Sequence, residues 1–267
     1  MRAAWIVVFI AVISPARAET VQLYAAGSLR SALTEVAKVF EAQSGIPVQA
    51  RYGPSGLLKD EIAGGAKAEV FASANMEHPE ALSAAGKAGP VRRFARNRLC
   101  ALVKAGLTVD SASLLDRMLD PSVKLGTSTP KSDPSGDYTW ELFRKADAIR
   151  PGAGAMLETK ALQLMGGAGS AQPPSGRLVY AWHIEEGRAD IFLAYCTATR
   201  ESQRQSPALQ IVELPDNLAV GADYGLTVIA GAPPAAARFS DFIMSRAGQQ
   251  ILTSHGFAPG QTKGEMP

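Results

Sequence analysis

The hydrophobic pattern of the chain alternates between the spacing of strands and the spacing of helices. A β-rich run at 21–25 is followed by apolar positions that recur at helical spacing, and the runs at 48–52 and 69–72 predict two further strands. The apolar positions of the first predicted helix are Leu29, Leu33, Val36 and Phe40. Strands that alternate with helices are typical of parallel sheets covered by helices. The pattern therefore predicts an α/β fold.

The same alternation continues through the second half of the chain. The runs 99–103, 123–128 and 190–195 predict strands, and helices are expected near 138–145 and 177–186. The Gly- and Pro-rich stretch 166–176 (GGAGSAQPPSG) predicts a surface loop.

A length of 267 residues suits two α/β lobes better than one. The chain is expected to cross between the lobes near 96–98 and again near 222–225. Lobe 1 is therefore assigned to residues 19–97 and 224–267, and lobe 2 to residues 98–223.

The N-terminus has the pattern of a secretory signal peptide. Arg2 supplies a positive charge, an apolar stretch spans 3–14, and Ala16-Arg17-Ala18 matches the small-residue pattern of a cleavage site. The apolar stretch is short for a bilayer span, so an uncleaved anchor is the less favoured alternative. We expect residues 1–18 to be removed after Ala18 and the mature protein to be periplasmic.

The overall charge is close to neutral. Lys and Arg number 27 and Asp and Glu 25, which leaves a formal charge of +2. Such a balance provides no broad basic field for nucleic acid or for anionic lipid. Any anion that this protein binds must be held by local geometry rather than by net charge.

The two cysteines, Cys100 and Cys196, both lie in strand-like runs. Export to an oxidising compartment permits a disulfide, whereas two buried free thiols would act as small apolar residues. The sequence leaves both alternatives open.

Two serines follow predicted strands and open predicted helices. Ser28 lies in AAGSL (25–29) and Ser55 in YGPSG (52–56). The carboxyl ends of strands in an open α/β sheet form the ligand crevice, and a helix N-terminus there offers free N–H groups to an anion. The alternative is that each serine is an ordinary helix cap.

Three further candidates lie in the second half of the chain. Ser135, in DPSGDY (133–138), begins a predicted helix, and its N–H and that of Gly136 are candidate anion donors unless they form a capped turn. The guanidinium of Arg177 can donate two hydrogen bonds to one oxyanion. The alternative is that Arg177 is a solvated residue in the first turn of a helix. Tyr195 ends a predicted strand, where its phenol is a candidate donor or a packing group.

Enzymatic signatures are lacking in the sequence. His78, His183 and His255 show no metal-ligand spacing, and no G-x-S-x-G elbow, dinucleotide fingerprint or P-loop is present. We expect no enzyme. An exported hydrolase with Ser28 or Ser55 as nucleophile is an alternative, but it requires a histidine base nearby.

The residues discussed above lie within a wider resemblance. AAGSL (25–29), GPSG (53–56), AEVFASAN (68–75), GRADIFLAY (187–195), ADYGLTVIAG (222–231) and SRAGQQILTSHGF (245–257) occur in the order found in the periplasmic molybdate-binding proteins of ABC importers. The chain resembles that family over nearly all of its mature length. The resemblance implies the type II solute-binding fold, with two mostly parallel sheets flanked by helices and two hinge crossovers.

The resemblance also implies a ligand and its contacts. Ser28, Ser55 and Tyr195 match residues that donate to the oxygens of molybdate and do not ligate the metal itself. Ser135 falls at a backbone-amide contact of the second lobe, and Arg177 falls near another. Both residues depart from the family pattern.

A bound dianion must have its hydration shell replaced by protein donors. Donors from both lobes would favour the closed state, and the absence of acceptors facing the ligand would disfavour protonated phosphate. We therefore expect a monomer without a resident cofactor that binds molybdate, and with it tungstate, and delivers it to an ABC permease in the inner membrane. The alternatives are sulfate, a small carboxylate held by Arg177, or a sensory or adhesion module with this fold.

Overall fold

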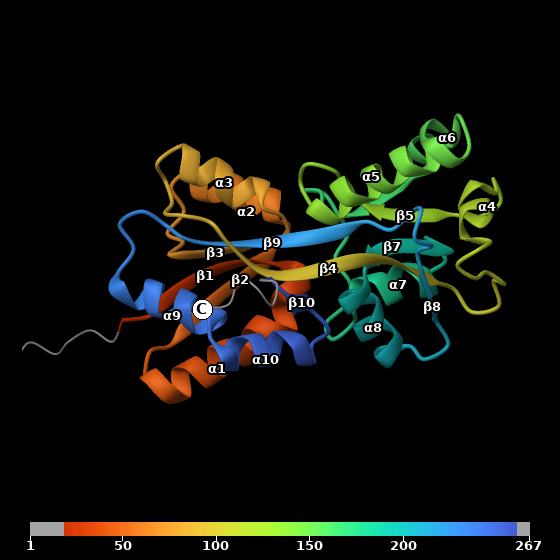
Figure 1. The fold of residues 1–267 in the computed structure, drawn as a ribbon. Helices are drawn as coiled ribbons and strands as arrows, with labels where there is room; N and C mark the ends of the chain where they lie inside the picture. The colour runs from red at the N-terminus through yellow and green to blue at the C-terminus, as the bar shows by residue number, and fades with distance from the viewer. Residues whose placement is uncertain (1–18, 261–267) are drawn as a thin grey trace, which may run out of the picture.

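A computed structural model describes residues 19–260, so the predicted signal peptide lies outside the described residues. The protein is a mixed α/β molecule with two lobes, as expected (Figure 1). In the described part of the chain the strands follow the order β2-β1-β3-β9-β4-β7-β5-β6, with β8 and β10 (Ala258–Pro259) paired to β4.

Lobe 1 is built on parallel strands from the N-terminal third of the chain. These are β1 (Val21–Ala26), β2 (Val48–Gly53) and β3 (Val70–Ser73), and β9 (Gly221–Val228) runs antiparallel to β3. One face of the sheet carries α1 (Arg30–Ser44), α9 (Pro234–Met244) and α10 (Arg246–Ser254), and the other carries α2 (Ser55–Ala63) and α3 (Glu77–Ala84) (Figure 1).

Lobe 2 repeats the arrangement with a second set of strands. Strand β5 (Leu125–Ser128) runs parallel to β6 (Leu162–Met165) and to β7 (Ile191–Tyr195), and β8 (Gln210–Glu213) pairs with β4. The helices of this lobe are α4 (Leu114–Leu119), α5 (Pro134–Ile149), α6 (Ala153–Lys160), α7 (Val179–Glu185) and α8 (Cys196–Gln205).

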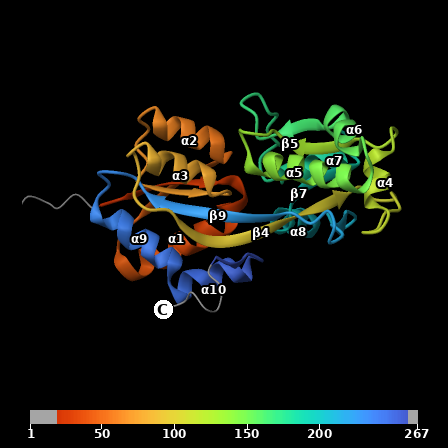
Figure 2. The same cartoon turned by 45° about the horizontal axis from the view of Figure 1, so that its top comes forward.

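One long strand joins the two lobes. In β4 (Arg92–Val103), the half up to Arg98 pairs with β9, and the half from Leu99 onward pairs with β7 and β8. Strands β4 and β9 lie side by side between the lobes (Figure 2). The residue boundaries assigned to the lobes from the sequence remain a prediction.

The first helix forms as its apolar spacing predicts. Leu33, Val36 and Phe40 are buried on the inner side of α1, where the Phe40 ring packs on that of Phe239 with centroids 5.0 Å apart. The helix ends at Gly45, whose φ of 70° suits glycine because it has no Cβ. Ser28 precedes this helix in a short 3-10 turn (Gly27–Leu29).

The two cysteines form a disulfide between Cys100 and Cys196, with Cα atoms 4.9 Å apart. This bond ties the connecting strand β4 to the first residue of α8. The residue before Cys196 is Tyr195, so the bond also fixes the end of β7. No described helix is long and apolar enough to cross a membrane.

Candidate functional site

Ser28 lies at the lobe 1 side of the junction and contacts a tyrosine from β9. Its hydroxyl is 3.0 Å from that of Tyr224, which also accepts a hydrogen bond from the Asn97 amide at 3.3 Å. The same amide donates to the Thr197 hydroxyl at 2.9 Å. Because Tyr224 accepts from Asn97, its own proton is available to Ser28. Ser28 can then direct its proton at a ligand.

Ser55 is the first residue of α2 and is fully buried. Its hydroxyl accepts a hydrogen bond of 3.1 Å from the Ala74 N–H, which leaves the serine proton free to donate. The carbonyl of the same Ala74 accepts a 3.4 Å hydrogen bond from the Tyr195 hydroxyl of lobe 2. Ser55 and Tyr195 therefore meet, across the two lobes, at the backbone of a single residue, Ala74.

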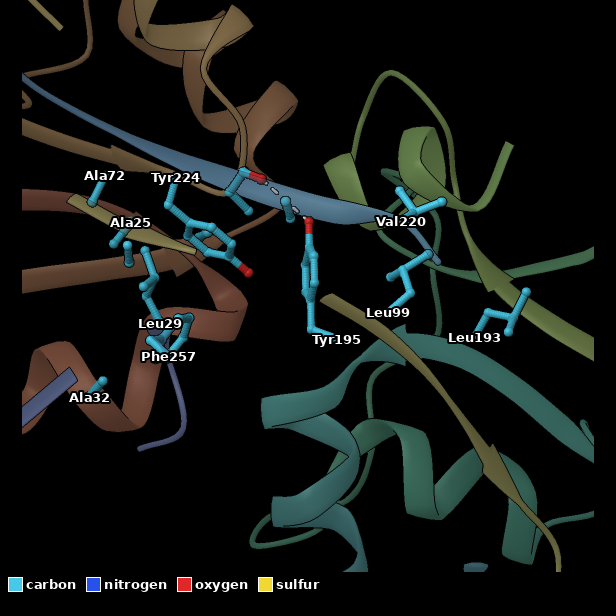
Figure 3. Close-up of a cluster of buried hydrophobic side chains, with 14 of the residues drawn as sticks. Ala25, Leu29, Ala32, Ala72, Leu99, Leu193, Tyr195, Val220, Tyr224 and Phe257 are labelled. Atoms are coloured by element: carbon cyan, nitrogen blue, oxygen red, sulfur yellow. Dashed lines mark hydrogen bonds between the residues drawn. The ribbon is translucent and has the colours of Figure 1, made fainter. Parts of the chain in front are cut away.

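The tyrosines connect the two serines. The rings of Tyr195 and Tyr224 have centroids 5.6 Å apart, and Tyr195 is 6.3 Å from the ring of Tyr138 in α5. Figure 3 shows Tyr195 and Tyr224 side by side, with the Tyr195 hydroxyl directed toward its hydrogen bond on lobe 1. The structure thus brings Ser28, Ser55 and Tyr195 together in one connected set of contacts.

Burial keeps the phenols of this cluster protonated. Desolvation raises the pKa of Tyr195 well above its ordinary value, and it raises the pKa of Tyr224 and of Tyr138 in the same direction. Neutral phenols donate hydrogen bonds at every physiological pH. The cluster is consequently rich in uncharged donors.

The N-termini of α2 and α5 face each other across the lobes. The N–H of Gly56 donates to the Ser132 carbonyl at 2.9 Å. A Cβ at Gly56 would lie 2.2 Å from the Lys131 carbonyl oxygen, so only glycine fits this approach. The two lobes are in direct backbone contact beside Ser55.

The Ser135 amide is used within lobe 2 and is not free for a ligand. It donates to the carboxylate of Asp133, the N-cap of α5, at 3.1 Å, and the Gly136 N–H donates to the Asp133 carbonyl at 2.8 Å. The alternative of a capped turn is therefore the one that the structure adopts. The Ser135 hydroxyl, by contrast, is fully buried without a hydrogen-bond partner.

Asp133 changes the electrostatics of lobe 2. Its side chain is 8% exposed, and desolvation raises the pKa of this carboxyl to about 6, against the opposing effect of the Ser135 N–H. Its charge in turn raises the pKa of Tyr195 and of Tyr180. Lobe 2 therefore contains a buried hydrogen-bond acceptor whose charge acts on the phenols of Tyr180 and Tyr195.

The structure does not bring Arg177 to this cluster. Its guanidinium forms an ion pair with Glu185, the last residue of α7, and its neighbour Leu178 donates to Gln205 at 2.8 Å. Gln205 ends α8, the helix that begins directly after Tyr195. The two ends of α8 are nine residue steps apart, which corresponds to about 13 Å along the helix axis. Arg177 is a partly exposed residue whose described contacts lie near the C-terminal end of α8 and not near its start beside Tyr195.

The histidines do not form a catalytic arrangement with the serines. His255 contacts Glu35 at 2.8 Å, and His183 is buried against Trp182 and Phe192. None of the described histidines hydrogen-bonds to Ser28 or Ser55, and the described residues contain no cluster of His, Cys, Asp or Glu that suits a metal ion.

Sequence reasoning missed three contributors to the cluster: Asn97, Asp133 and Tyr224. Tyr224 lies in a run that carries the resemblance, and Asp133 immediately precedes a Pro-Ser-Gly helix start, which is the usual signature of a cap. Asn97 has no comparable local signal, because its role depends on the crossing of β4 between the lobes.

Comparison with known proteins places the chain in a family. Residues 21–258 match the model of the bacterial extracellular solute-binding proteins. A Pasteurella multocida protein called "Uncharacterized protein PM1146" is 35% identical over 89% of this chain and 98% of its own length. The molybdate-binding protein ModA of Mycobacterium tuberculosis is 26% identical over 90% of this chain and 85% of its own.

A solved structure supports the fold independently. The sulfate-binding protein SubI of Mycobacterium tuberculosis superposes with a TM-score of 0.72, at 20% identity, over 90% of this chain and 87% of that protein. At this identity the likeness shows the two-lobed fold and carries no information about the ligand.

Proposed function

The chain belongs to the bacterial extracellular solute-binding proteins, and from that premise we propose that it captures a small tetrahedral oxyanion between its lobes. In this proposal it acts in the periplasm, after removal of the signal peptide, and hands its ligand to an ABC permease of the inner membrane. Molybdate is the first candidate, with tungstate beside it, because a relative that spans most of the chain is a molybdate-binding protein.

The observation that carries the proposal is the set of hydroxyls whose protons are free to donate. Ser55 accepts from the Ala74 N–H, and Ser28 can accept from Tyr224, so both serines keep a proton with which to donate. The Tyr195 hydroxyl donates to the Ala74 carbonyl over 3.4 Å, which is long for a hydroxyl donor. A ligand oxygen can readily replace this acceptor. Neutral donors of this kind replace the hydration shell of an anion.

Closure follows from the origin of these donors. Ser28 and Ser55 belong to lobe 1, and Tyr195 belongs to lobe 2. A ligand that binds all three gains more contacts in the closed state than in the open state, and this difference in affinity shifts the population toward closure. The permease would then recognise the closed form.

A thermal-shift panel followed by calorimetry tests this function. The mature protein is scanned with molybdate, tungstate, sulfate, phosphate, a ferric salt and small carboxylates. We expect a tetrahedral oxyanion to raise the melting temperature in a concentration-dependent way, because it binds only the folded state. A response to carboxylates or iron alone, with no response to any tetrahedral oxyanion, would reject the proposal while the fold assignment stands.

The hydrolase alternative is not favoured by the contacts of the serines. Ser28 is bonded to a tyrosine and Ser55 to a backbone N–H, and neither contact supplies a base that could remove the hydroxyl proton. The carboxylate alternative that relied on Arg177 is not favoured either, because that side chain is paired with Glu185.

A further inference from the structure

Asn97 lies on β4 at the crossing between the lobes and forms hydrogen bonds on both sides of it. We propose that Asn97 is a positioning residue for the anion site: its side-chain amide sets the direction of a hydrogen-bond chain that ends at Ser28, so that Ser28 offers a donor to the ligand. This inference rests on the proposed oxyanion function and deepens it. The donor suits a fully deprotonated oxyanion such as molybdate, whose oxygens can only accept hydrogen bonds.

A backbone contact fixes which end of the Asn97 amide is the donor. The carbonyl oxygen of the side chain accepts the N–H of Arg98 at 2.9 Å. A backbone N–H can only donate, so the atom that it meets is the oxygen of the amide and not the nitrogen. The nitrogen therefore faces the hydroxyls of Thr197, at 2.9 Å, and of Tyr224, at 3.3 Å. It donates one proton to each of them.

The Tyr224 hydroxyl has one acceptor left for its own proton. The residue is fully buried, so bulk water does not reach it. Among the described residues its hydroxyl meets only the Asn97 nitrogen, which cannot accept, and the Ser28 hydroxyl at 3.0 Å. Buried polar groups are almost always hydrogen-bonded, so the phenol donates to Ser28. Burial also raises the pKa of Tyr224, which keeps this proton on the phenol.

The Tyr224 ring is held in place by other aromatic rings. Phe94 and Phe257 lie edge-on to it, with ring centroids 6.3 and 5.5 Å away. The ring of Tyr195 lies at 5.6 Å. A ring that is packed on these sides cannot turn its hydroxyl toward another acceptor. The direction of the hydrogen bond to Ser28 is therefore set by the amide of Asn97.

Ser28 is the end of the chain that a ligand can reach. It lies in the 3-10 turn before α1 and is only half-buried. Its oxygen accepts from Tyr224, and none of the described residues accepts its proton, which is therefore available to a ligand oxygen. If the chain ran in the opposite direction, Ser28 would donate to Tyr224 and would offer a ligand only lone pairs, which repel an anion. The other end is Thr197, the second residue of α8, so the chain connects the two lobes.

Asn97→Asp reverses the chain with almost no change in shape. A carboxylate only accepts, so it takes the proton of Tyr224, and the phenol oxygen then takes the proton of Ser28. The test measures the affinities of molybdate and sulfate by calorimetry at pH 7.5 for the wild type, Asn97→Asp, Tyr224→Phe and the double variant. Asn217→Asp is the matched control, because it adds the same charge at an exposed residue in the turn between β8 and β9.

We expect Asn97→Asp to bind the tighter dianion about fiftyfold more weakly than the wild type, because it loses the Ser28 donor and gains a negative charge nearby. Tyr224→Phe should lose less than about tenfold, since the Ser28 proton stays free, and Asn217→Asp should stay within about twofold. The double variant should bind about fivefold more tightly than Asn97→Asp, because without the phenol the carboxylate cannot draw on the Ser28 proton.

This rescue separates a positioning role from a structural one. If Asn97 only supported the crossing strands, loss of a second side chain from the same chain of contacts would weaken binding further. A double variant that binds as weakly as Asn97→Asp would overturn the inference, and so would wild-type affinity in Asn97→Asp. The oxyanion function would survive either result. A wild type that binds neither dianion also overturns the inference, and the oxyanion function then survives only if the thermal-shift panel shows another tetrahedral oxyanion.

Circular dichroism and urea unfolding check that each variant is folded. Should Asn97→Asp not fold, Asn97→Ala takes its place. Without a donor to the phenol, the hydrogen bond between Tyr224 and Ser28 has no set direction, so this substitution should weaken binding in the wild type more than in the Tyr224→Phe background. Equal losses in the two backgrounds would overturn the inference.

Discussion

The two lobes offer an anion different chemistry. Lobe 1 presents the hydroxyls of Ser28 and Ser55, each oriented by one neighbour and each free to donate. Lobe 2 presents the neutral phenol of Tyr195 together with the carboxyl of Asp133, while its helix N–H groups are already bonded. Lobe 1 therefore brings only neutral hydroxyl donors to the junction, whereas lobe 2 adds a buried carboxyl that caps its own helix.

The disulfide is expected to have the largest effect on stability, and it lies on the lobe 2 side of this comparison. Replacing Cys100 and Cys196 together with alanine removes a cross-link between residues 96 apart. The free energy of unfolding should fall by about 2–5 kcal/mol, mainly because the unfolded chain is released.

Urea unfolding of the double variant measures this effect, and unfolding of the wild type in a reducing agent provides the matched control. The position of Tyr195 should loosen with the bond, so ligand affinity should fall as well. A loss of less than about 1 kcal/mol would show that the bond is not a main stabilising element.

The buried charge of Asp133 should lower the free energy of unfolding of the ligand-free protein at neutral pH. Its pKa in the folded state, about 6, is higher than the ordinary 3.8, so protonation favours the folded state and stability declines as the pH rises through that interval. Asp133→Asn should therefore be more stable than the wild type at pH 7.5, by up to about 3 kcal/mol.

Near pH 3.5 the same variant should show little gain, because the aspartate is then protonated in the folded state and mostly protonated in the unfolded state. Urea unfolding at the two pH values checks the sign. A variant that is less stable at pH 7.5 would mean that the charge of Asp133 contributes to capping more than its burial costs.

The two serines of lobe 1 should contribute similar amounts to ligand affinity. Ser28→Ala and Ser55→Ala each remove one donor to a charged ligand, so each should weaken binding by about 1.5–3 kcal/mol. Ser55→Ala also leaves the buried Ala74 N–H without its acceptor, so without ligand this variant should lose more stability than Ser28→Ala, in which the Tyr224 hydroxyl keeps its bond from Asn97. Calorimetry and thermal unfolding separate the two effects, and unchanged affinity in both variants would remove lobe 1 from the site.

Among these substitutions, that of Arg177 should have the smallest effect on ligand affinity. Its ion pair with Glu185 is partly exposed on both sides, and such pairs contribute about 0–1 kcal/mol. Arg177→Ala should keep the ligand affinity of the wild type within twofold. A tenfold loss by calorimetry would return this arginine to the site and contradict the placement described above.

Much of lobe 1 was predictable from the sequence because its signals are local. The spacing of Leu33, Val36 and Phe40 fixes the buried face of α1, and the two serines follow strand ends directly. The period of the hydrophobic positions and the turn residues are enough to predict such elements.

Lobe 2 was harder because its decisive contacts are not local. The sequence left open whether the Ser135 amide is a free donor or part of a capped turn, and the structure shows that the acid two residues earlier binds it. Arg177 was placed by counting along the sequence, and the loop before α7 carries it to the far end of α8. The pairing of Cys100 with Cys196 depends on β4 lying beside the start of α8, which no local pattern encodes.

In the proposed site, donors from both lobes hold one oxyanion. A crystal structure of the mature protein grown with the tightest oxyanion of the panel tests it most directly. We expect the anion between the lobes, within hydrogen-bond distance of the hydroxyls of Ser28, Ser55 and Tyr195. An anion bound to one lobe alone, or on the outer surface beside Arg177, would contradict it.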